Sequence, residues 1–217
     1  MTSPDINFGG TVFLPLLSGG LYWPEKQALI ISDMHLEKGS SYLKYGLFLP
    51  PYDTVETLKK LNRDIAAVKP QSIIFLGDIL HDKTALQRIN ATDLTAFDII
   101  LERHQIIWVE GNHDTGTAPP NVKIHSDYMF DNIAFRHIAE DDADLHEISG
   151  HYHPCTDFTH KGQRLRRPCF AVSQNKIIMP SYGAYTGGLD IKHPAIQKPL
   201  GPAFSLYVLG HKKLYRL

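Results

Sequence analysis

The sequence predicts an α/β fold, α+β under some schemes, in which helices flank two packed β-sheets. Three observations lead to this expectation: short apolar runs that end in turn residues, two segments with apolar residues every three or four positions, and a second half rich in strand-like segments. With 43% hydrophobic and 21% charged residues, the 217-residue chain has the composition of a globular protein with a substantial core. We therefore expect one domain over residues 1–217.

Short apolar runs predict the strands of the first half. The first two form an expected hairpin, and the later runs are continuously apolar, as in strands buried on both faces. In chain order the segments are Val12–Leu14, Gly20–Trp23, Ala28–Ser32, Ser72–Leu76 and Ile106–Val109.

Two helices are expected between these strands. From Asp53 the apolar residues recur with a helical period until Pro70, and Asp53 with Glu56 resembles a capping box. A second helix is expected at Thr92–Arg103. Strands that alternate with helices favour a parallel sheet, which gathers its site at the carboxyl ends of the strands.

After Pro120 the sequence is rich in strand-like segments. These are Val122–His125, Tyr128–Phe130, Ile133–His137, Leu145–Ser149, Arg166–Ser173, Lys176–Met179 and Ala203–Leu209. Lys192–Pro202 contains three prolines and is predicted to be a loop.

Charge and apolar patterning limit the possible functions. The formal net charge is −1, so nucleic acid could bind only through a local basic patch or bound metal. The chain shows neither a signal peptide nor an apolar run long enough to span a membrane, so we expect a cytoplasmic protein. Cys155 and Cys169 lack the spacing of a metal or redox motif, and we expect packed thiols.

Four polar islands follow strand-like runs. They are Asp33-Met34-His35, Gly77-Asp78, Gly111-Asn112-His113-Asp114 and Gly150-His151-Tyr152-His153. Each island is weak evidence alone, because aspartate, asparagine and glycine favour turns and a histidine can be an ordinary strand residue. Together, in this order, they predict a site for two metal ions.

The spacing within the islands fits shared ligation. Asp33 and His35 are two residues apart, so on an extended strand end they would point to one side, and His151 and His153 have the same spacing. Each pair would therefore be able to face a metal ion.

The other ligands complete the donor set. Asp78 is the natural bridging carboxylate, Asn112 offers an amide oxygen, and His137 is the expected further nitrogen ligand of the second ion. A mixture of oxygen and nitrogen donors without thiolate favours manganese, iron or zinc.

Such a centre predicts phosphoester hydrolysis. Two ions would acidify a shared hydroxide and hold a phosphate for in-line attack. His113, which lies between Asn112 and Asp114, would stabilise the transition state as an imidazolium or protonate the leaving oxygen. Asp114 would orient His113 and balance its charge.

These islands resemble those of the calcineurin-like binuclear metallophosphoesterase superfamily over about residues 28 to 188. The resemblance implies a four-layer αββα architecture, with a β-sandwich flanked by helices, and a catalytic role for His113. It also implies how the ligands divide: one ion is held by Asp33, His35 and His153, the other by Asn112, His137 and His151, with Asp78 bridging them.

A narrower likeness is to the ligase-associated DNA damage response endonucleases of the PdeM type. It rests on Asp33–Gly39 with the later Gly46 and Pro50, Gly77–His81, His151–Pro154, Arg164–Phe170 and Pro180–Gly188. The chain departs from that pattern at Glu37, where glycine is expected, and after His137, where Ile138-Ala139-Glu140 replaces an expected Glu-Pro. The likeness implies a manganese-dependent phosphodiesterase acting on DNA, single-stranded DNA above all, in repair beside a ligase and a helicase.

A basic cluster offers a candidate substrate surface. Lys161, Arg164, Arg166 and Arg167 are close in sequence, and Arg164 and Arg166 would share one strand face that could contact phosphates. An edge strand protected by charge explains the cluster equally well.

Ring side chains are further candidates for substrate contact. Tyr42, Tyr182 and Tyr185 could stack on bases, although tyrosine is also common in sheets. His81 could contact substrate from the rim of the site, or simply cap a helix or lie on the surface.

The leading hypothesis is thus a binuclear phosphodiesterase, a DNA endonuclease acting in repair. The first alternative is a phosphoesterase or pyrophosphatase of small nucleotides or dinucleotides, because one metal core serves many substrates. A remote alternative is a non-catalytic scaffold. It is disfavoured because the chain retains the expected metal ligands and His113.

Overall fold

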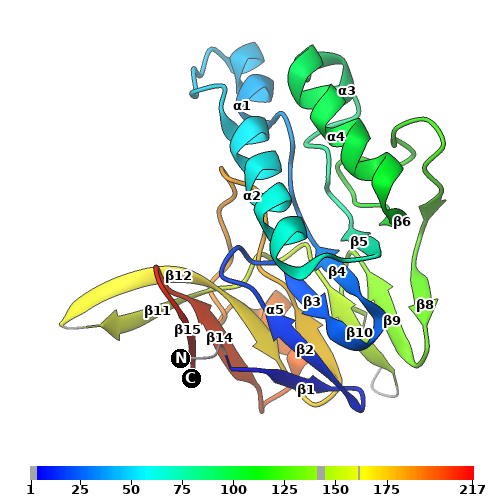
Figure 1. Cartoon of the computed structure of the whole chain (residues 1–217). Helices are drawn as coiled ribbons and strands as arrows, with labels where there is room; N and C mark the ends of the chain where they lie inside the picture. The colour runs from blue at the N-terminus through cyan, green and yellow to red at the C-terminus, as the bar shows by residue number, and fades with distance from the viewer. Residues whose placement is uncertain (1–3, 141–144, 161) are drawn as a thin grey trace.

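The computed structural model describes residues 4–140, 145–160 and 162–217, and its two β-sheets pack face to face between helices (Figure 1). Seven strands of the first sheet follow chain order, antiparallel from β1 to β4 and parallel from β4 to β7. They are β1 (Ile6–Phe8), β2 (Thr11–Pro15), β3 (Leu21–Trp23), β4 (Ala28–Ile31), β5 (Ser72–Leu76), β6 (Gln105–Val109) and β7 (Ile124–His125). The predicted hairpin and parallel strands are confirmed.

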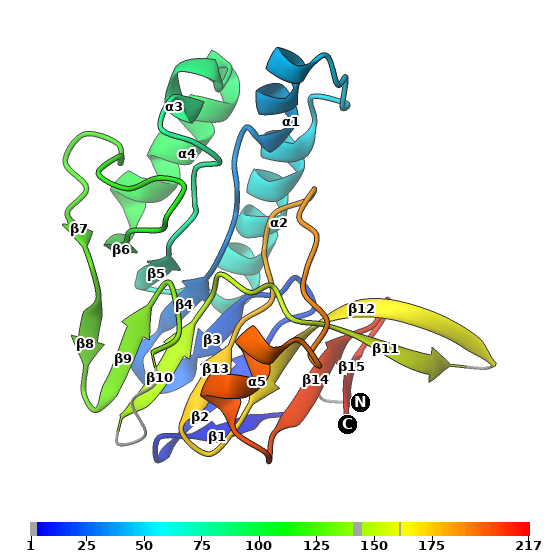
Figure 2. The same cartoon turned by 180° about the vertical axis from the view of Figure 1, so that it is seen from behind.

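The second sheet is formed by the later strands in the order β15-β14-β12-β13-β10-β9-β8, and β11 pairs with β12. Here β9, β10 and β13 are parallel neighbours. The strands are β8 (Tyr128–Phe130), β9 (Ile133–Arg136), β10 (His146–Ser149), β11 (Cys155–His160), β12 (Gln163–Val172), β13 (Lys176–Ile178), β14 (Ser205–Leu209) and β15 (Leu214–Arg216). The hairpin of β11 and β12 extends beyond the body of the molecule in both views (Figures 1 and 2).

Helices cover the two outer faces of the sandwich. The helical elements are η1 (Pro24–Lys26), α1 (Lys38–Ser41), η2 (Tyr42–Tyr45), α2 (Asp53–Val68), α3 (Ala85–Arg88), α4 (Ala91–Arg103) and α5 (Pro194–Leu200). Helices α1 to α4 lie on the side of the first sheet, whereas α5 lies against the second sheet (Figure 2).

Three apolar layers hold this arrangement together. Ile74 of the first sheet meets Phe135 and Ile148 of the second in the layer between the sheets. Leu58 of α2 and Phe97 of α4 pack in the layer outside the first sheet. The third layer lies between α5 and the second sheet. The predicted αββα order is therefore confirmed, because each sheet buries both of its faces.

The prediction of a loop at Lys192–Pro202 was wrong, because α5 occupies most of this segment. Pro194 stands at the first helical position, where no backbone N–H is needed, and the His193 ring accepts a hydrogen bond from the Ala195 N–H at 3.2 Å. Ile196 and Leu200 are buried against the second sheet. The prolines are thus compatible with a short helix, and burial of its apolar residues holds this helix against the second sheet.

The predicted capping box of α2 was also wrong. Tyr52 is the N-cap residue and makes no side-chain capping bond. The Asp53 carboxylate instead accepts a hydrogen bond from the Gly39 N–H at 2.8 Å. Asp53 therefore ties the start of α2 to helix α1.

Two further expectations concern cysteines and membranes. Cys155 and Cys169 are buried free thiols, and burial raises the pKa of both, as expected of packed side chains. In the described parts of the chain, every helix is too short or too polar to cross a bilayer.

Candidate metal centre

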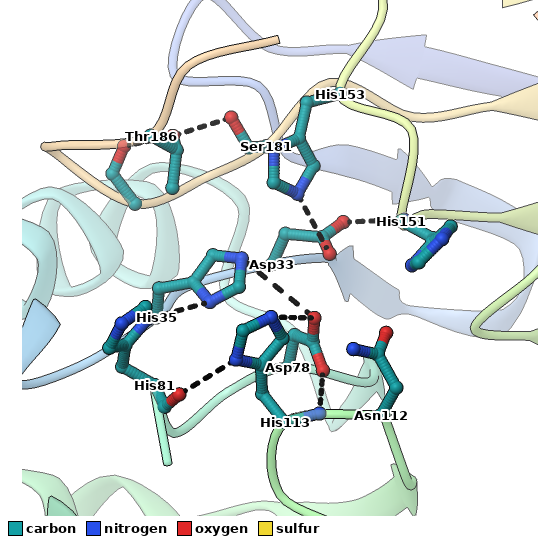
Figure 3. Close-up of polar contacts among 12 residues, drawn as sticks. Asp33, His35, Asp78, His81, Asn112, His113, His151, His153, Ser181 and Thr186 are labelled. Atoms are coloured by element: carbon teal, nitrogen blue, oxygen red, sulfur yellow. Dashed lines mark hydrogen bonds and ion pairs between the residues drawn. The ribbon is translucent and has the colours of Figure 1, made fainter. Parts of the chain in front are cut away.

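Parallel strand ends from both sheets meet at one place. Each candidate ligand lies just beyond a strand: Asp33 after β4, Asp78 after β5, Asn112 after β6, His137 after β9, and His151 and His153 after β10. Figure 3 shows the side chains of Asp33, Asp78, Asn112, His151 and His153 arranged around a common centre. The sandwich thus brings together groups that are far apart in the sequence.

The ligand loops are not extended, in contrast to the geometry expected from the spacing. Asp33, His35, His151 and His153 all have left-handed backbone angles, with φ of 54°, 46°, 68° and 47°. Non-glycine residues rarely adopt this region, and such outliers cluster at functional sites. The side chains of each pair therefore converge through alternate left-handed residues and not through strand geometry.

Backbone hydrogen bonds hold the first two loops side by side. Asp33 N–H donates to the Gly77 carbonyl at 3.1 Å, and His35 N–H donates to the Asp78 carbonyl at 2.9 Å. The Asp33 carboxylate accepts hydrogen bonds from the Ser32 hydroxyl and from the His151 N–H, the latter at 3.0 Å. The carboxylate is thereby oriented before any ligand arrives.

Asp33, His35 and His153 form the first candidate ion site. One potential ligand atom of each lies within 4.8 Å of the others. His153 Nε2 is 3.0 Å from Asp33 Oδ1, yet Asp33 Oδ1, His35 Nε2 and His153 Nε2 are buried without a hydrogen bond of normal geometry in the described chain. Buried polar atoms without partners are costly, and a cation would satisfy all three.

Asp78, His137 and His151 form the second candidate site, and Asn112 adjoins it. His137 Nε2 lies 3.4 Å from Asp78 Oδ2, 3.0 Å from Asn112 Oδ1 and 3.2 Å from His151 Nδ1. Four donor atoms thus crowd one point, as a divalent ion with nitrogen and oxygen ligands requires.

Asp78 lies between the two sites. Its Oδ2 is 3.9 Å from His35 Nε2 on one side and 3.4 Å from His137 Nε2 on the other. Its Oδ1 accepts a hydrogen bond from the His113 N–H at 2.9 Å. This is the position that a bridging carboxylate needs.

The charge balance of the centre suits cations. Although burial opposes it, His137 lowers the pKa of Asp78 to about 2, so the carboxylate is ionised at neutral pH. Burial disfavours the charged form of His137, but the Asp78 and Asp33 carboxylates raise its pKa to about 9. A metal ion at His137 would therefore displace a proton, as metals that bind titratable ligands do.

Two ligand histidines are oriented by backbone carbonyls. His137 Nδ1 lies 2.9 Å from the Leu76 carbonyl, and His153 Nδ1 lies 3.0 Å from the Gly187 carbonyl. Since a carbonyl only accepts, each Nδ1 carries a proton, so in the neutral ring the lone pair is on Nε2 and is directed at the centre. Metal-binding histidines are commonly fixed in this way.

His113 lies at the edge of the centre with 41% of its side chain exposed. Its Nδ1 is 2.9 Å from the His81 carbonyl, and its Nε2 is 3.9 Å from Asp78 Oδ2. Nε2 is thus directed at the candidate centre.

The expected pairing of Asp114 with His113 is corrected by the structure. Both Asp114 oxygens accept from backbone N–H groups, Oδ1 from Gly111 at 2.8 Å and Oδ2 from Ile79 at 2.8 Å and Leu80 at 3.3 Å. Asp114 is fully buried and holds two site loops together. The His81 carbonyl occupies the orienting position beside His113 instead.

The candidate substrate residues have varied surroundings. The Arg164 side chain is 79% exposed and pairs with Asp157 at 2.8 Å, whereas Arg166 contacts Asp190 at 3.4 Å and the Gly188 carbonyl at 3.1 Å. The two arginines share the exposed face of β12, as expected, and Arg166 approaches the segment that orients His153. Lys161 lies outside the described residues.

Of the three candidate tyrosines, Tyr182 is placed where it cannot stack on a nucleic-acid base. Tyr182 is fully buried and donates its hydroxyl to Asp64 at 2.8 Å, so stacking on a base is excluded for it. Tyr185 is partly buried and donates to the Pro50 carbonyl at 3.0 Å. Tyr42 stacks on the His81 ring, with 6.3 Å between ring centres. His81 itself stacks on His113, and burial lowers its pKa to about 4.

Sequence reasoning missed the small residues and carbonyls that shape the centre. A Cβ at Gly111 would clash with the Asp78 carboxylate and backbone nitrogen, and a Cβ at Gly150 would clash with the Ser32 hydroxyl. Glycine at the start of three of the four polar islands was the only signal. The carbonyls of Leu76, Gly187 and His81 carry no signal, because every residue has one.

We expect Gly111→Ala to destabilise the protein and disturb the centre. Its methyl group would push against Asp78 in a packed site, which costs about 1–3 kcal/mol. For a chain of this size each kcal/mol lowers Tm by about 2–4 °C. Gly187→Ala is the matched control, because a Cβ there meets nothing within 4 Å. Thermal unfolding and metal content of both variants test this, and equal values for the two would contradict it.

Comparison with known proteins agrees with this geometry. The sequence model of calcineurin-like phosphoesterases matches residues 27–168, well over half of the chain. The chain is similar in structure to the nuclease MPE of Pseudomonas putida, with a TM-score of 0.77, 25% identity and 100% of both chains covered. It is more distantly similar to Yfce, a phosphoesterase from E. coli, with a TM-score of 0.44, 12% identity and coverage of 88% and 97% of the two chains. No curated protein matches significantly.

Proposed function

The chain belongs to the calcineurin-like phosphoesterase family, and we propose that it is a binuclear metal-dependent phosphodiesterase that cleaves DNA. One observation carries the proposal: two triads of ligand atoms lie side by side, Asp78 belongs to one of them, and three buried atoms of the other have no hydrogen-bond partner in the described chain. Two divalent cations would satisfy these atoms. The proposed ligands are Asp33, His35 and His153 for one ion, Asn112, His137 and His151 for the other, and Asp78 for both.

The bound ions would supply Lewis acidity toward a phosphodiester and acidify water. The chain provides the rest of the chemistry. With Nδ1 fixed on the His81 carbonyl, His113 can direct a proton on Nε2 to the leaving oxygen or to the charge of the transition state. Asp114 supports this step only indirectly, by holding the loops that carry Asp78 and His113.

DNA as substrate is supported by the structural likeness to a nuclease and by exposed basic and apolar side chains. Arg164 and Arg166 line the projecting hairpin and could contact phosphates, although Asp157 and Asp190 offset part of their charge. Between α1 and α2, Leu47 and Phe48 are exposed, Phe48 at 85%. Exposed apolar and aromatic groups suit unpaired bases, which supports single-stranded DNA.

The decisive experiment compares substrates with manganese present. We expect cleavage of single-stranded DNA, weaker cleavage of duplex DNA, and little turnover of small nucleotides or dinucleotides. Turnover of nucleotides alone would replace the nuclease assignment with a small-molecule phosphoesterase. Absence of any hydrolysis by the metal-loaded protein would indicate a scaffold.

Manganese should also stabilise the folded protein. Ions that bind only the native state at 100 times their Kd add about 2.7 kcal/mol, which for this chain length corresponds to a rise in Tm of about 5–11 °C. Thermal unfolding with Mn²⁺, Fe²⁺ and Zn²⁺, against chelator, would rank the metals, and we expect manganese to be the one that supports activity. An unchanged Tm with every ion would contradict the proposed centre.

A role in DNA repair, association with a DNA ligase and a helicase, and a cytoplasmic location stay predictions. Sensitivity of a strain lacking the protein to DNA-damaging agents would test the first of these.

A further inference from the structure

The His81 side chain occupies an unusual place beside the metal centre. Its ring lies between two others, stacked on His113 at 5.2 Å with an interplanar angle of 24° and on Tyr42 at 6.3 Å with an angle of 19°. The backbone N–H of His81 donates a hydrogen bond to the carbonyl of Leu36 at 3.0 Å. Leu36 is the residue next to His35 in the chain. Ring plane and backbone are therefore both fixed.

The held ring points Nδ1 at the Nδ1 of His35, 3.5 Å away. The opposite nitrogen of His35, Nε2, is the buried atom without a partner that faces the first ion site. His35 thus has the same arrangement as His137 and His153, with Nδ1 outward and Nε2 inward. The difference is its acceptor, which is a side chain and not a backbone carbonyl.

With a metal ion at His35 Nε2, this contact would fix the tautomers of both rings. If Nε2 of His35 is to offer a lone pair to a metal ion, the proton of the neutral ring must be on Nδ1. His81 Nδ1 must then accept a hydrogen bond from the His35 Nδ1–H group, so the proton of the neutral His81 ring is on Nε2. One residue thus serves two neighbours, because its side chain faces His35 and its carbonyl faces His113.

We propose that His81 is a positioning residue, which holds ligand His35 in its metal-binding tautomer and rotamer by accepting a hydrogen bond from His35 Nδ1. The inference rests on the proposed metal centre. It differs from a direct contact between His81 and substrate, which would use the outer nitrogen, Nε2.

Two amide substitutions separate these roles. Asparagine places its carbonyl oxygen near the position of a histidine Nδ1, whereas glutamine reaches the position of Nε2. His81→Asn should therefore keep the acceptor for His35, and His81→Gln should lose it. Loss of a partner that orients a metal ligand costs about 10–100-fold in metal affinity.

The test is manganese binding to the full chain without substrate, by calorimetry or competition with a fluorescent chelator. We expect two ions per wild-type chain, a 10–100-fold weaker site in His81→Gln, and an affinity in His81→Asn close to that of the wild type. With saturating manganese, the KM of His81→Asn for a phosphodiester should stay unchanged.

Other outcomes would overturn the inference. Equal manganese affinity in both variants, or a KM raised by His81→Asn and not by His81→Gln, would assign His81 to substrate contact. A third ion lost in both variants would assign His35, His81 and His113, whose ring nitrogens also cluster within 4.8 Å, to a metal site of their own. Failure of the wild type to bind manganese would instead refute the proposed centre itself, so the two failures are distinguishable.

Discussion

Asp78→Asn is expected to lower phosphodiester hydrolysis by about 1000-fold or more and to leave at most one metal ion per chain. The proposed bridge has one carboxylate for two cations, so removal of its charge weakens both sites at once. Several kcal/mol of transition-state stabilisation depend on such ions, and each 1.36 kcal/mol is a factor of ten in rate.

The substitution should spare the fold. Asparagine has nearly the volume of aspartate, and its Oδ1 can still accept the His113 N–H that Asp78 accepts at 2.9 Å. Asp98→Asn, on helix α4 and away from the centre, is a matched control for loss of one carboxylate. Metal content by mass spectrometry and hydrolysis of an activated diester are the measurements. Two tightly bound ions or wild-type turnover in Asp78→Asn would refute the bridging role.

His113→Gln is expected to lower kcat by about 100- to 10,000-fold while both ions remain bound. The His113 ring approaches Asp78 through Nε2, at 3.9 Å, and is not needed as a ligand in the proposed set. Glutamine can donate a hydrogen bond but cannot transfer a proton at neutral pH. The variant therefore removes proton transfer with little change in polarity.

The leaving group distinguishes the two roles open to His113. If His113 protonates the leaving oxygen, the loss should be large for a natural dinucleotide and much smaller for a p-nitrophenyl diester, whose leaving group needs no proton. If it only stabilises charge on the phosphoryl oxygens, both substrates should lose equally. His104→Gln, at the end of α4, is the control. Loss of a metal ion in His113→Gln would show that His113 is a ligand.

Much of the fold follows from local sequence patterns. Buried runs such as Ile73–Leu76 read as strands because both faces of the sheet are covered, and α2 shows its buried face as a helical period. The predictions of local structure were wrong where tertiary contacts outweigh local sequence signals. Pro194 and Pro199 suggested a loop, but the burial of Ile196 selects a helix.

The candidate site was predicted at the level of residue types and not of geometry. The positions of Asp33 and His35 after a strand brought them to the centre, but the left-handed turns that aim them cannot be read from spacing. Asp114 was misassigned because a carboxylate beside a histidine suggests a pair, whereas its oxygens are taken up by backbone N–H groups. Such contacts depend on loops distant in sequence.

The proposed ligands come from both sheets, so the centre assembles late in folding. Asp33 and Asp78 follow strands of the first sheet, whereas His137, His151 and His153 follow strands of the second. The bond from His151 to Asp33 closes a separation of 118 residues, and contacts of that range are slow to form. The centre is therefore complete only after the sheets have docked. Bound ions would then slow unfolding more than they speed folding, so metal loading would set the lifetime of the folded chain.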